Sequence, residues 1–332
     1  MKKRGIGIGS MLYVIGYAFS RPDHAGAIIE MAQDGSVLLI SGITEFGQGS
    51  TTGLAQIAAE ELGIKTEQVK VLSGDSTLAQ DSGPTSASRS MYVSGSAVLK
   101  AVRHLKESLM ETASEMLETP ADDLVARGGK LYPKDAPERG ISISKVASMC
   151  HIKGKRCIGF GYHSNVTPDA DPKTGQGDTV ATFGYATQLA EIEVDTETGW
   201  VEVLRFTSFN DAGKAINPLN VEGQVEGGIS MGVGFTLHEN FLVEEGRPLT
   251  TSFAEYLLPT AMDMPAMETF LVEETPDPTG PFGAKGMGEA AAVPAAPAIL
   301  NAIYNAIGVR ITDLPITPEK VLAALQEKTE RK

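Results

Sequence analysis

The residue best suited to acid–base chemistry in this sequence is a carboxylate within a glycine-rich stretch. Glu289 ends the run GPFGAKGMGE, which holds four glycines and one lysine, and the apolar run AAAVPAAPA follows it. A carboxylate with apolar neighbours can act as a general base, because an apolar setting disfavours its charged form. An exposed loop acid, or an acid beside a helix N-terminus, would have the same local sequence. The local sequence leaves these interpretations equally open.

Three glycine- or serine-rich loops that lead into helices could bind an anionic ligand. They span residues 46–49, 84–90 and 283–289. Backbone N–H groups at a helix start can bind an anion, and glycine lets a ligand approach the backbone closely. Together the loops could hold a large phosphorylated cofactor, although any one of them could be a simple turn or helix cap.

Two glutamines and the metal-ligating residue types complete the set of candidates. Gln48 and Gln224 each lie next to glycine, and an amide can donate and accept hydrogen bonds at once, as a pterin or oxo ligand requires. Alone, each could equally be a surface amide.

Cys150 and Cys157 are the only cysteines, and the histidines have no metal-binding spacing. We therefore expect no zinc site and no iron–sulfur cluster held by this chain alone.

Two glycine patterns look like nucleotide-binding motifs but lack the required context. Residues 5–10 depart from the dinucleotide pattern at their last position, and residues 286–291 follow a loop rather than a strand. The run GAKGMG does not match a P-loop either. The sequence therefore disfavours a nicotinamide or P-loop nucleotide site.

The elements that position these residues follow from local patterns. Residues 25–40 are expected to form two strands around the turn Asp34-Gly35, and residues 54–62 a helix that ends at Gly63. Another helix is expected over 98–109, a short one after Pro120, and a last one from Pro294 to Gly308. The mixture of strands and helices without regular alternation predicts an α+β fold.

The chain divides into two expected lobes. Residues 161–177 are rich in Gly, Pro, Asp and Thr and are predicted to be a loop or linker. We therefore expect one lobe over residues 1–160 and a second over 178–325, which begins with a hairpin around Gly199.

Composition excludes several classes of partner. The chain has 332 residues, 42% of them hydrophobic, and 28 basic against 42 acidic residues give a net charge of -14. Such a charge repels nucleic acid and anionic membrane surfaces. No segment has the roughly 20 uninterrupted apolar residues of a membrane span, and the N-terminus is a poor signal peptide. We expect a cytoplasmic protein.

Several of these segments, in this order, resemble the C-terminal half of the molybdenum subunit of the molybdenum hydroxylases, the xanthine dehydrogenase and aldehyde oxidoreductase family. The resemblance covers most of residues 1–320 and is carried by the stretches EFGQGSTTGLAQIAAEELGI, DSGPTSASRSMYVSG, AEIEVDTETGWVEV, NDAGKAINPLNVEGQVEGGISMGVGF, GPFGAKGMGEAAAVPAAPAI and LPITPEKVLAAL. It implies a two-lobed molybdopterin-binding domain.

The resemblance also implies which residues have which role. Glu289 corresponds to the family's catalytic glutamate, the general base in a hydroxylation that takes its oxygen from water. No protein side chain ligates molybdenum in that family. The positions that correspond to cofactor contacts are Phe46, Gly47, Gln48, Ser86, Ala87, Ser88, Arg89, Ser90, Gln224, Lys285, Gly286, Met287 and Gly288.

The resemblance further implies partners and a substrate class. The family's molybdenum subunit is more than twice as long as this chain, so we expect a heteromer with a larger molybdopterin subunit, a subunit with [2Fe–2S] clusters and an FAD subunit. The cofactor would be molybdenum with molybdopterin, in its cytosine dinucleotide form.

A molybdenum subunit that is divided into separate chains resembles the nicotinate dehydrogenases, which implies an N-heteroaromatic substrate such as nicotinate. The same chemistry on a purine or an aldehyde is the alternative, and a scaffold subunit that only braces the cofactor is an alternative of another class.

Overall fold

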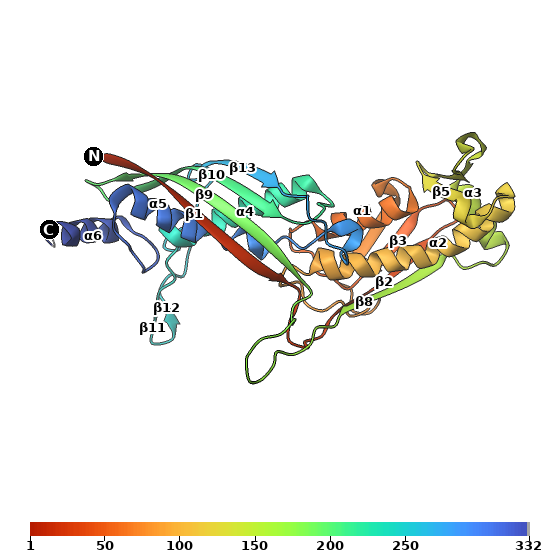
Figure 1. The fold of residues 1–332 in the computed structure, drawn as a ribbon, viewed down its shortest axis with the longest axis horizontal. Helices are drawn as coiled ribbons and strands as arrows, with labels where there is room; N and C mark the ends of the chain where they lie inside the picture. Colours follow the sequence, from red (N-terminus) through yellow and green to blue (C-terminus); the bar gives the residue numbers. More distant parts are fainter. Residues whose placement is uncertain (331–332) are drawn as a thin grey trace.

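The chain folds into two lobes that lie end to end along one long axis (Figure 1). The structure is a computed structural model and describes residues 1–330. Both the N-terminus and the end of the described chain lie at the far end of one lobe, and helix α2 (Gly95–Leu117) extends toward the far end of the other (Figure 1). The chain crosses between the lobes twice, once after residue 15 and again after residue 165.

The first lobe is a four-stranded sheet covered by helices. Its strand order is β4-β3-β2-β8. The strands are β2 (Asp23–Met31), β3 (Val37–Ser41), β4 (Val69–Ser73) and β8 (Ile158–Asn165), and the helices are α1 (Ser50–Leu62), α2 (Gly95–Leu117) and α3 (Ile143–Ile152). A small sheet of β5 (Leu124–Arg127), β6 (Lys130–Pro133) and β7 (Ile141–Ser142) lies at its outer end. Fully buried residues such as Ile29, Leu39 and Leu54 form its core, and burying each stabilises the lobe by about 1.5–3 kcal/mol.

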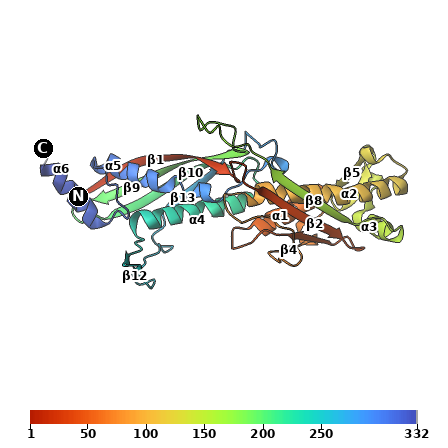
Figure 2. The ribbon, with the colours of Figure 1, turned by 90° about the horizontal axis from the view of Figure 1, so that it is seen from below.

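The second lobe has its own sheet and its own core. Its strand order is β1-β9-β10-β13, and a separate two-stranded hairpin projects from it. The elements are β1 (Lys2–Ile15), β9 (Thr182–Asp195), β10 (Val201–Asp211), α4 (Pro218–Leu237), β11 (Val243–Glu244), β12 (Arg247–Pro248), β13 (Ala266–Leu271), α5 (Ala295–Ile307) and α6 (Pro318–Glu330). Helices α4 and α5 lie along one side of this sheet (Figure 2).

The alternating glycines near the N-terminus have a packing role. In β1, Gly5, Gly7 and Gly9 face α5, and a Cβ atom on Gly7 would lie 2.1 Å from the carbonyl oxygen of Ala298. The strand lies directly on the helix backbone because these positions have no side chain. Residues 5–10 are thus part of a helix–sheet contact.

Three sequence expectations differ from the structure. Strand β1 pairs along its whole length with β9, so residues 2–15 lie in the second lobe, although the expected first lobe began at residue 1. Strand β8 pairs with β2, so the first lobe extends to Asn165. The helix expected after Pro120 is wrong beyond its first turn, because Gly128 and Gly129 instead form the turn between β5 and β6.

One helical stretch is apolar and long enough to cross a membrane by length and composition alone. It spans Glu289–Ile307, and 56% of its most apolar window is buried. Helix α5 supplies Ile299 and Ile303 to the core of the second lobe. Packing within the protein accounts for its apolar character.

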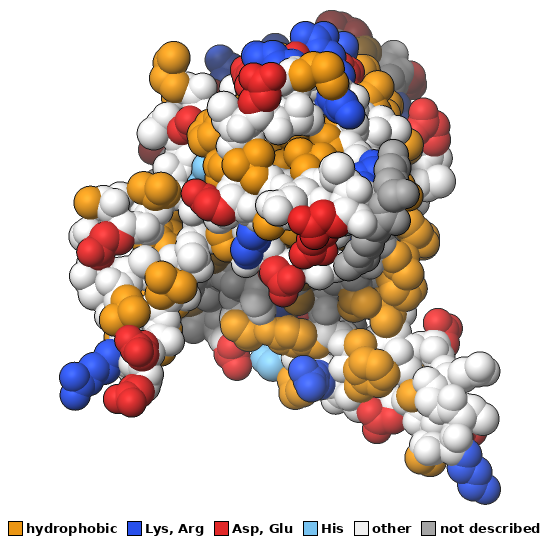
Figure 3. Space-filling view, turned by 90° about the vertical axis from the view of Figure 1, so that its left-hand side faces the viewer, with side chains coloured by type: hydrophobic (Ala, Val, Ile, Leu, Met, Phe, Trp, Pro, Cys, Tyr) orange, Lys and Arg blue, Asp and Glu red, His pale blue; other side chains and the backbone are white. Residues whose placement is uncertain are grey.

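Two segments project from the body. The hairpin β11–β12 and the loop between β8 and β9 both extend below it in Figure 1, and both are separate projections in Figure 3. Around the hairpin, residues 239–265 carry exposed apolar side chains, with Phe253 78% and Met262 93% exposed. The described chain does not bury these side chains itself.

Candidate active site

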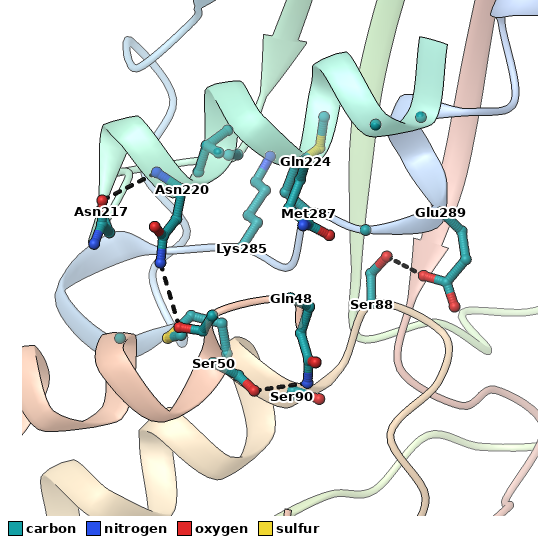
Figure 4. Close-up of a pocket in the computed structure, with 18 of the residues that line it drawn as sticks. Gln48, Ser50, Ser88, Ser90, Asn217, Asn220, Gln224, Lys285, Met287 and Glu289 are labelled. Atoms are coloured by element: carbon teal, nitrogen blue, oxygen red, sulfur yellow. Dashed lines mark hydrogen bonds between the residues drawn. The ribbon is translucent and has the colours of Figure 1, made fainter. Parts of the chain in front are cut away.

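A cavity of about 600 Å³ lies between the two lobes and is lined by residues from both. The first lobe contributes the start of α1 and the loop before α2, and the second contributes α4 and the loop that leads to Glu289 (Figure 4). Ten of the candidate residues from the sequence line this one cavity: Phe46, Gln48, Ser86, Ser88, Ser90, Gln224, Lys285, Met287, Gly288 and Glu289.

Four other candidates lie in the same loops but do not line the cavity. Gly47 has a φ of 113° and no atom near the place where a Cβ would be. Ala87 lies at the turn of its loop, and Gly286 is buried against the backbone of Ser88. Arg89 is only 1% exposed, and its side chain forms an ion pair with Asp23 inside the first lobe.

The start of α1 already holds an anion, which is a carboxylate of the protein itself. Glu45 accepts hydrogen bonds from the backbone N–H groups of Gly47, Gly49 and Thr51. Burial raises the pKa of Glu45, but these hydrogen bonds outweigh it and hold the pKa below its ordinary value. These three N–H groups are therefore not free to bind a ligand anion.

Gln48 is also held within the same loop. Its Nε2 donates to Thr44 O at 2.9 Å and to Ser50 Oγ at 2.7 Å, while its Oε1 accepts from the backbone N–H of Phe46. The side chain is thereby fixed beside the cavity without a ligand (Figure 4). A fixed amide loses little entropy when a ligand binds.

The other two loops keep free donors. Within the part of the chain that the structure describes, the backbone N–H groups of residues 86–88 and 286–288 donate no hydrogen bond to the protein. Ser86, Ser88, Met287 and Gly288 of these loops line the cavity. The cavity is thus edged by donors that a ligand with oxo, phosphate or pterin acceptors could use.

Glu289 begins the short helical turn Glu289–Ala291 at one end of the cavity. Its Oε2 accepts a hydrogen bond of 2.5 Å from Ser88 Oγ in the other lobe (Figure 4). The pKa of Tyr13 is raised to about 12, by burial first and then by the charge of Glu289 and a hydrogen bond to it. The side chain of Glu289 is exposed, so of the interpretations that the sequence left open the structure favours an exposed acid at a helix start over an apolar setting.

Lys285 is neutralised within the second lobe. Its Nζ lies 2.7 Å from Asp211 Oδ2, both side chains are about nine-tenths buried, and the ammonium lies over the ring of Tyr185. Because an unpaired buried charge is strongly destabilising, this pair holds the loop before Glu289 against β10. The lysine therefore presents its stem, rather than a free charge, to the cavity.

Helix α4 supplies residues that the sequence patterns did not single out. Asn217 caps the helix by accepting from the N–H of Asn220, and Pro218 follows at its first position. Asn220 Nδ2 donates across to Gly49 O of the first lobe at 3.4 Å. Farther along, Gly227 lines the cavity with open space where a Cβ would be. For Gly227 the sequence signal is the series of glycines in this helix, two of which, Gly223 and Gly227, are exposed.

No metal site of protein ligands accompanies the cavity. Among the described residues, no three His, Cys, Asp or Glu side chains are placed to hold a metal ion.

Comparison with known proteins gives a consistent result over most of the chain. The family described as the molybdopterin cofactor-binding domain matches residues 1–265. The gamma subunit of the 6-hydroxypseudooxynicotine dehydrogenase complex of Paenarthrobacter nicotinovorans is 36% identical over 99% of this chain and 41% of its own length. A putative xanthine dehydrogenase molybdenum-binding subunit of Escherichia coli K12 is 31% identical over 96% of this chain and 42% of its own.

A solved structure shares the fold. Quinoline 2-oxidoreductase from Pseudomonas putida 86 superposes with a TM-score of 0.86 at 28% identity, over 98% of this chain and 42% of that chain. This agreement confirms the expected α+β fold with two lobes. The chain spans about two fifths of the length of each of these proteins.

Proposed function

The chain belongs to the molybdopterin cofactor-binding domain family of the molybdenum hydroxylases, and from this premise we propose that it is a molybdopterin-binding subunit of a multi-subunit hydroxylase. The enzyme would hydroxylate an electron-poor carbon of an N-heteroaromatic substrate such as nicotinate, with water as the oxygen source. One observation supports this proposal most strongly: Glu289 lies at the same cavity as two loops, 86–88 and 286–288, that have free N–H groups.

The residues at the cavity fit a molybdopterin. A flat ligand with many acceptors needs unpaired donors and room beside the backbone. Within the described residues, the N–H groups of 86–88 and 286–288 are unpaired, and Gly227 leaves open a space that a side chain would fill. Gln48 and Gln224 would contact the pterin from opposite lobes, and Ser90 would add a hydroxyl.

Within this proposal, Glu289 is the general base. When bound, the molybdenum cofactor supplies the two-electron oxidation that converts a C–H group and water to a C–OH group and two protons. The carboxylate of Glu289 accepts one of these protons from the oxygen that attacks the substrate. Ser88 keeps the carboxylate at the cavity through the bond to Oε2, and the neighbouring Tyr13 stays neutral below about pH 12.

The names of the relatives support the substrate class. Hydroxypseudooxynicotine, xanthine and quinoline, which appear in those names, all contain a nitrogen heterocycle. A carbon next to ring nitrogen is electron-poor, and this favours attack by an oxygen nucleophile. The same chemistry on a purine or an aldehyde is the alternative substrate assignment.

The remaining parts of the proposal concern partners and location. One relative is named as a subunit of a dehydrogenase complex. The exposed apolar side chains of residues 239–265 also favour a partner surface. We therefore infer a larger molybdopterin subunit, a [2Fe–2S] subunit and an FAD subunit, with the cytosine dinucleotide form of the cofactor, in the cytoplasm.

The test is the variant Glu289→Gln in the purified complex. Loss of a general base lowers kcat by about 10²–10⁴-fold, while molybdenum and pterin contents stay at wild-type levels. Glu138→Gln, on an exposed turn of the first lobe, is the matched control and retains full activity. Normal turnover by Glu289→Gln would favour the scaffold alternative, in which the chain only braces the cofactor.

A further inference from the structure

We propose that Ser88 is a positioning residue that holds the Glu289 carboxylate at the cavity, and that a buried ion pair of the first lobe holds Ser88. This inference rests on the proposed role of Glu289 as the base. The two residues belong to different lobes and are 201 positions apart, yet Ser88 Oγ donates to Glu289 Oε2 at 2.5 Å (Figure 4). Hydrogen bonds to a charged carboxylate are the stronger kind and fix its direction.

The backbone around Ser88 is held in an unfavourable conformation. Ala87 has a φ of 52° and Ser88 a φ of 51°. Residues other than glycine avoid this left-handed region, and two in succession persist only when the surroundings impose it. The direction of the Ser88 hydroxyl is therefore set by its anchors rather than by local preference.

The first anchor is the buried side chain of Arg89. Its Nε donates to Asp23 Oδ1 at 2.5 Å, and both residues are at most 1% exposed. Its remaining nitrogens donate to the carbonyl oxygens of Ser82, Pro84 and His24. The guanidinium thus ties the loop that carries Ser88 to the start of β2.

The second anchor holds the other side of the turn. The hydroxyl groups of Ser86 and Tyr17 are 2.6 Å apart, and the N–H of Gly16 donates to Ala87 O at 2.9 Å. Gly16 and Tyr17 directly follow β1, which belongs to the second lobe. The turn is therefore fastened to both lobes.

The loop that carries Glu289 fits directly onto this turn. A Cβ on Gly286 would lie 1.5 Å from Ser88 O, and one on Gly288 would lie 3.3 Å from Ser88 Oγ. Only glycine at position 286 allows this approach. A shift of Ser88 consequently releases the hydrogen bond and the support beneath Glu289 together.

The experiment compares Ser88→Ala and Ser88→Gly in the purified holoenzyme complex. Both remove the hydroxyl, but glycine also relieves the positive φ, so a purely conformational role would spare Ser88→Gly. We expect both variants to lower kcat about tenfold or more, as loss of one hydrogen bond to a charged group implies, with KM within about twofold. Molybdenum and pterin contents stay unchanged.

A second readout does not depend on turnover. The infrared difference between wild type and Glu289→Gln isolates the carboxylate band of Glu289, and Ser88→Ala is expected to shift this band. The control is Ser36→Ala, which removes a similar hydrogen bond, from Ser36 Oγ to the carboxylate of Asp34 at 2.7 Å. It should leave the carboxylate band of Glu289 unchanged.

Three results would overturn the inference: an unshifted band, loss of molybdenum from Ser88→Ala, or recovered turnover in Ser88→Gly. If Glu289→Gln itself keeps full activity, the proposed function fails. If only the Ser88 variants keep it, the proposed function stands and the positioning role fails.

Discussion

The ion pair between Arg89 and Asp23 should be a major stabilising contact of the first lobe, and Asp23→Asn tests this. The substitution keeps the size of the side chain but removes the negative charge. Arg89 is then left charged and buried, with only its three carbonyl acceptors and a neutral amide. Asp23 also accepts from Tyr17 N and Asn165 Nδ2, and those bonds weaken too.

The expected loss follows from the burial of both partners. Removing one partner of a buried ion pair costs about 3–5 kcal/mol, because the other charge stays uncompensated. Urea denaturation of the full chain, followed by circular dichroism, measures this change in the free energy of unfolding. The turnover of the complex should fall as well, because Arg89 holds the loop of Ser88.

An exposed pair of similar length provides the control. Arg205 and Glu268 are 2.6 Å apart, but their side chains are 46% and 50% exposed. Since solvent screens such a pair, Glu268→Gln should leave the free energy of unfolding almost unchanged. A loss below about 1 kcal/mol for Asp23→Asn, the level of a surface ion pair, would refute the reasoning.

Three further predictions concern packing, ionisation and cofactor binding. Gly7→Ala would place a Cβ against Ala298 O and should lower the free energy of unfolding by about 1–3 kcal/mol in thermal unfolding, whereas Gly223→Ala on the open face of α4 should not destabilise the chain. Because the pKa of Tyr13 is about 12 when folded and lower when unfolded, its contribution to stability is complete below about pH 10 and is lost between about pH 10 and 12. Tyr13→Phe should abolish that alkaline loss, and an unchanged pH profile of stability would contradict the assignment. Gly227→Leu fills the cavity and should lower the molybdenum content of the purified complex, so a wild-type content would contradict the proposed location of the cofactor.

The local elements of the fold could be predicted from the sequence because their signals are local. The turn Asp34-Gly35 joins β2 and β3 as expected, and Gly63 ends α1 in a left-handed conformation. Gly308 ends α5 in the same way. Each of these features depends on the residue that a turn or cap requires.

The pairing of β1 with β9 could not be predicted in the same way. The two strands are separated by residues 16–181, and their register depends on contacts that no local pattern encodes. The signal that was present is the alternation of glycine and isoleucine in residues 5–9. This alternation indicates a strand with no side chains on one face. Only the structure shows that this face packs against the backbone of α5.

The candidate site shows the same division. The glycine-rich loops and Glu289 could be found from the sequence, because each is visible within one short stretch of residues. Glu45, Tyr13 and Asn220 could not, because each acquires its role only from tertiary contacts. The hydrogen bond to Glu289 could not be predicted for the same reason, since Ser88 approaches it from the other lobe.

The central claim is that the cavity between the lobes holds a molybdopterin with Glu289 at its reactive end. The most direct measurement is an anomalous difference map at the molybdenum absorption edge, from crystals of the purified complex. The account predicts a single molybdenum peak in this cavity, next to the carboxylate of Glu289 and beside residues 286–288. A peak elsewhere, with the carboxylate of Glu289 turned away from it, would contradict the account.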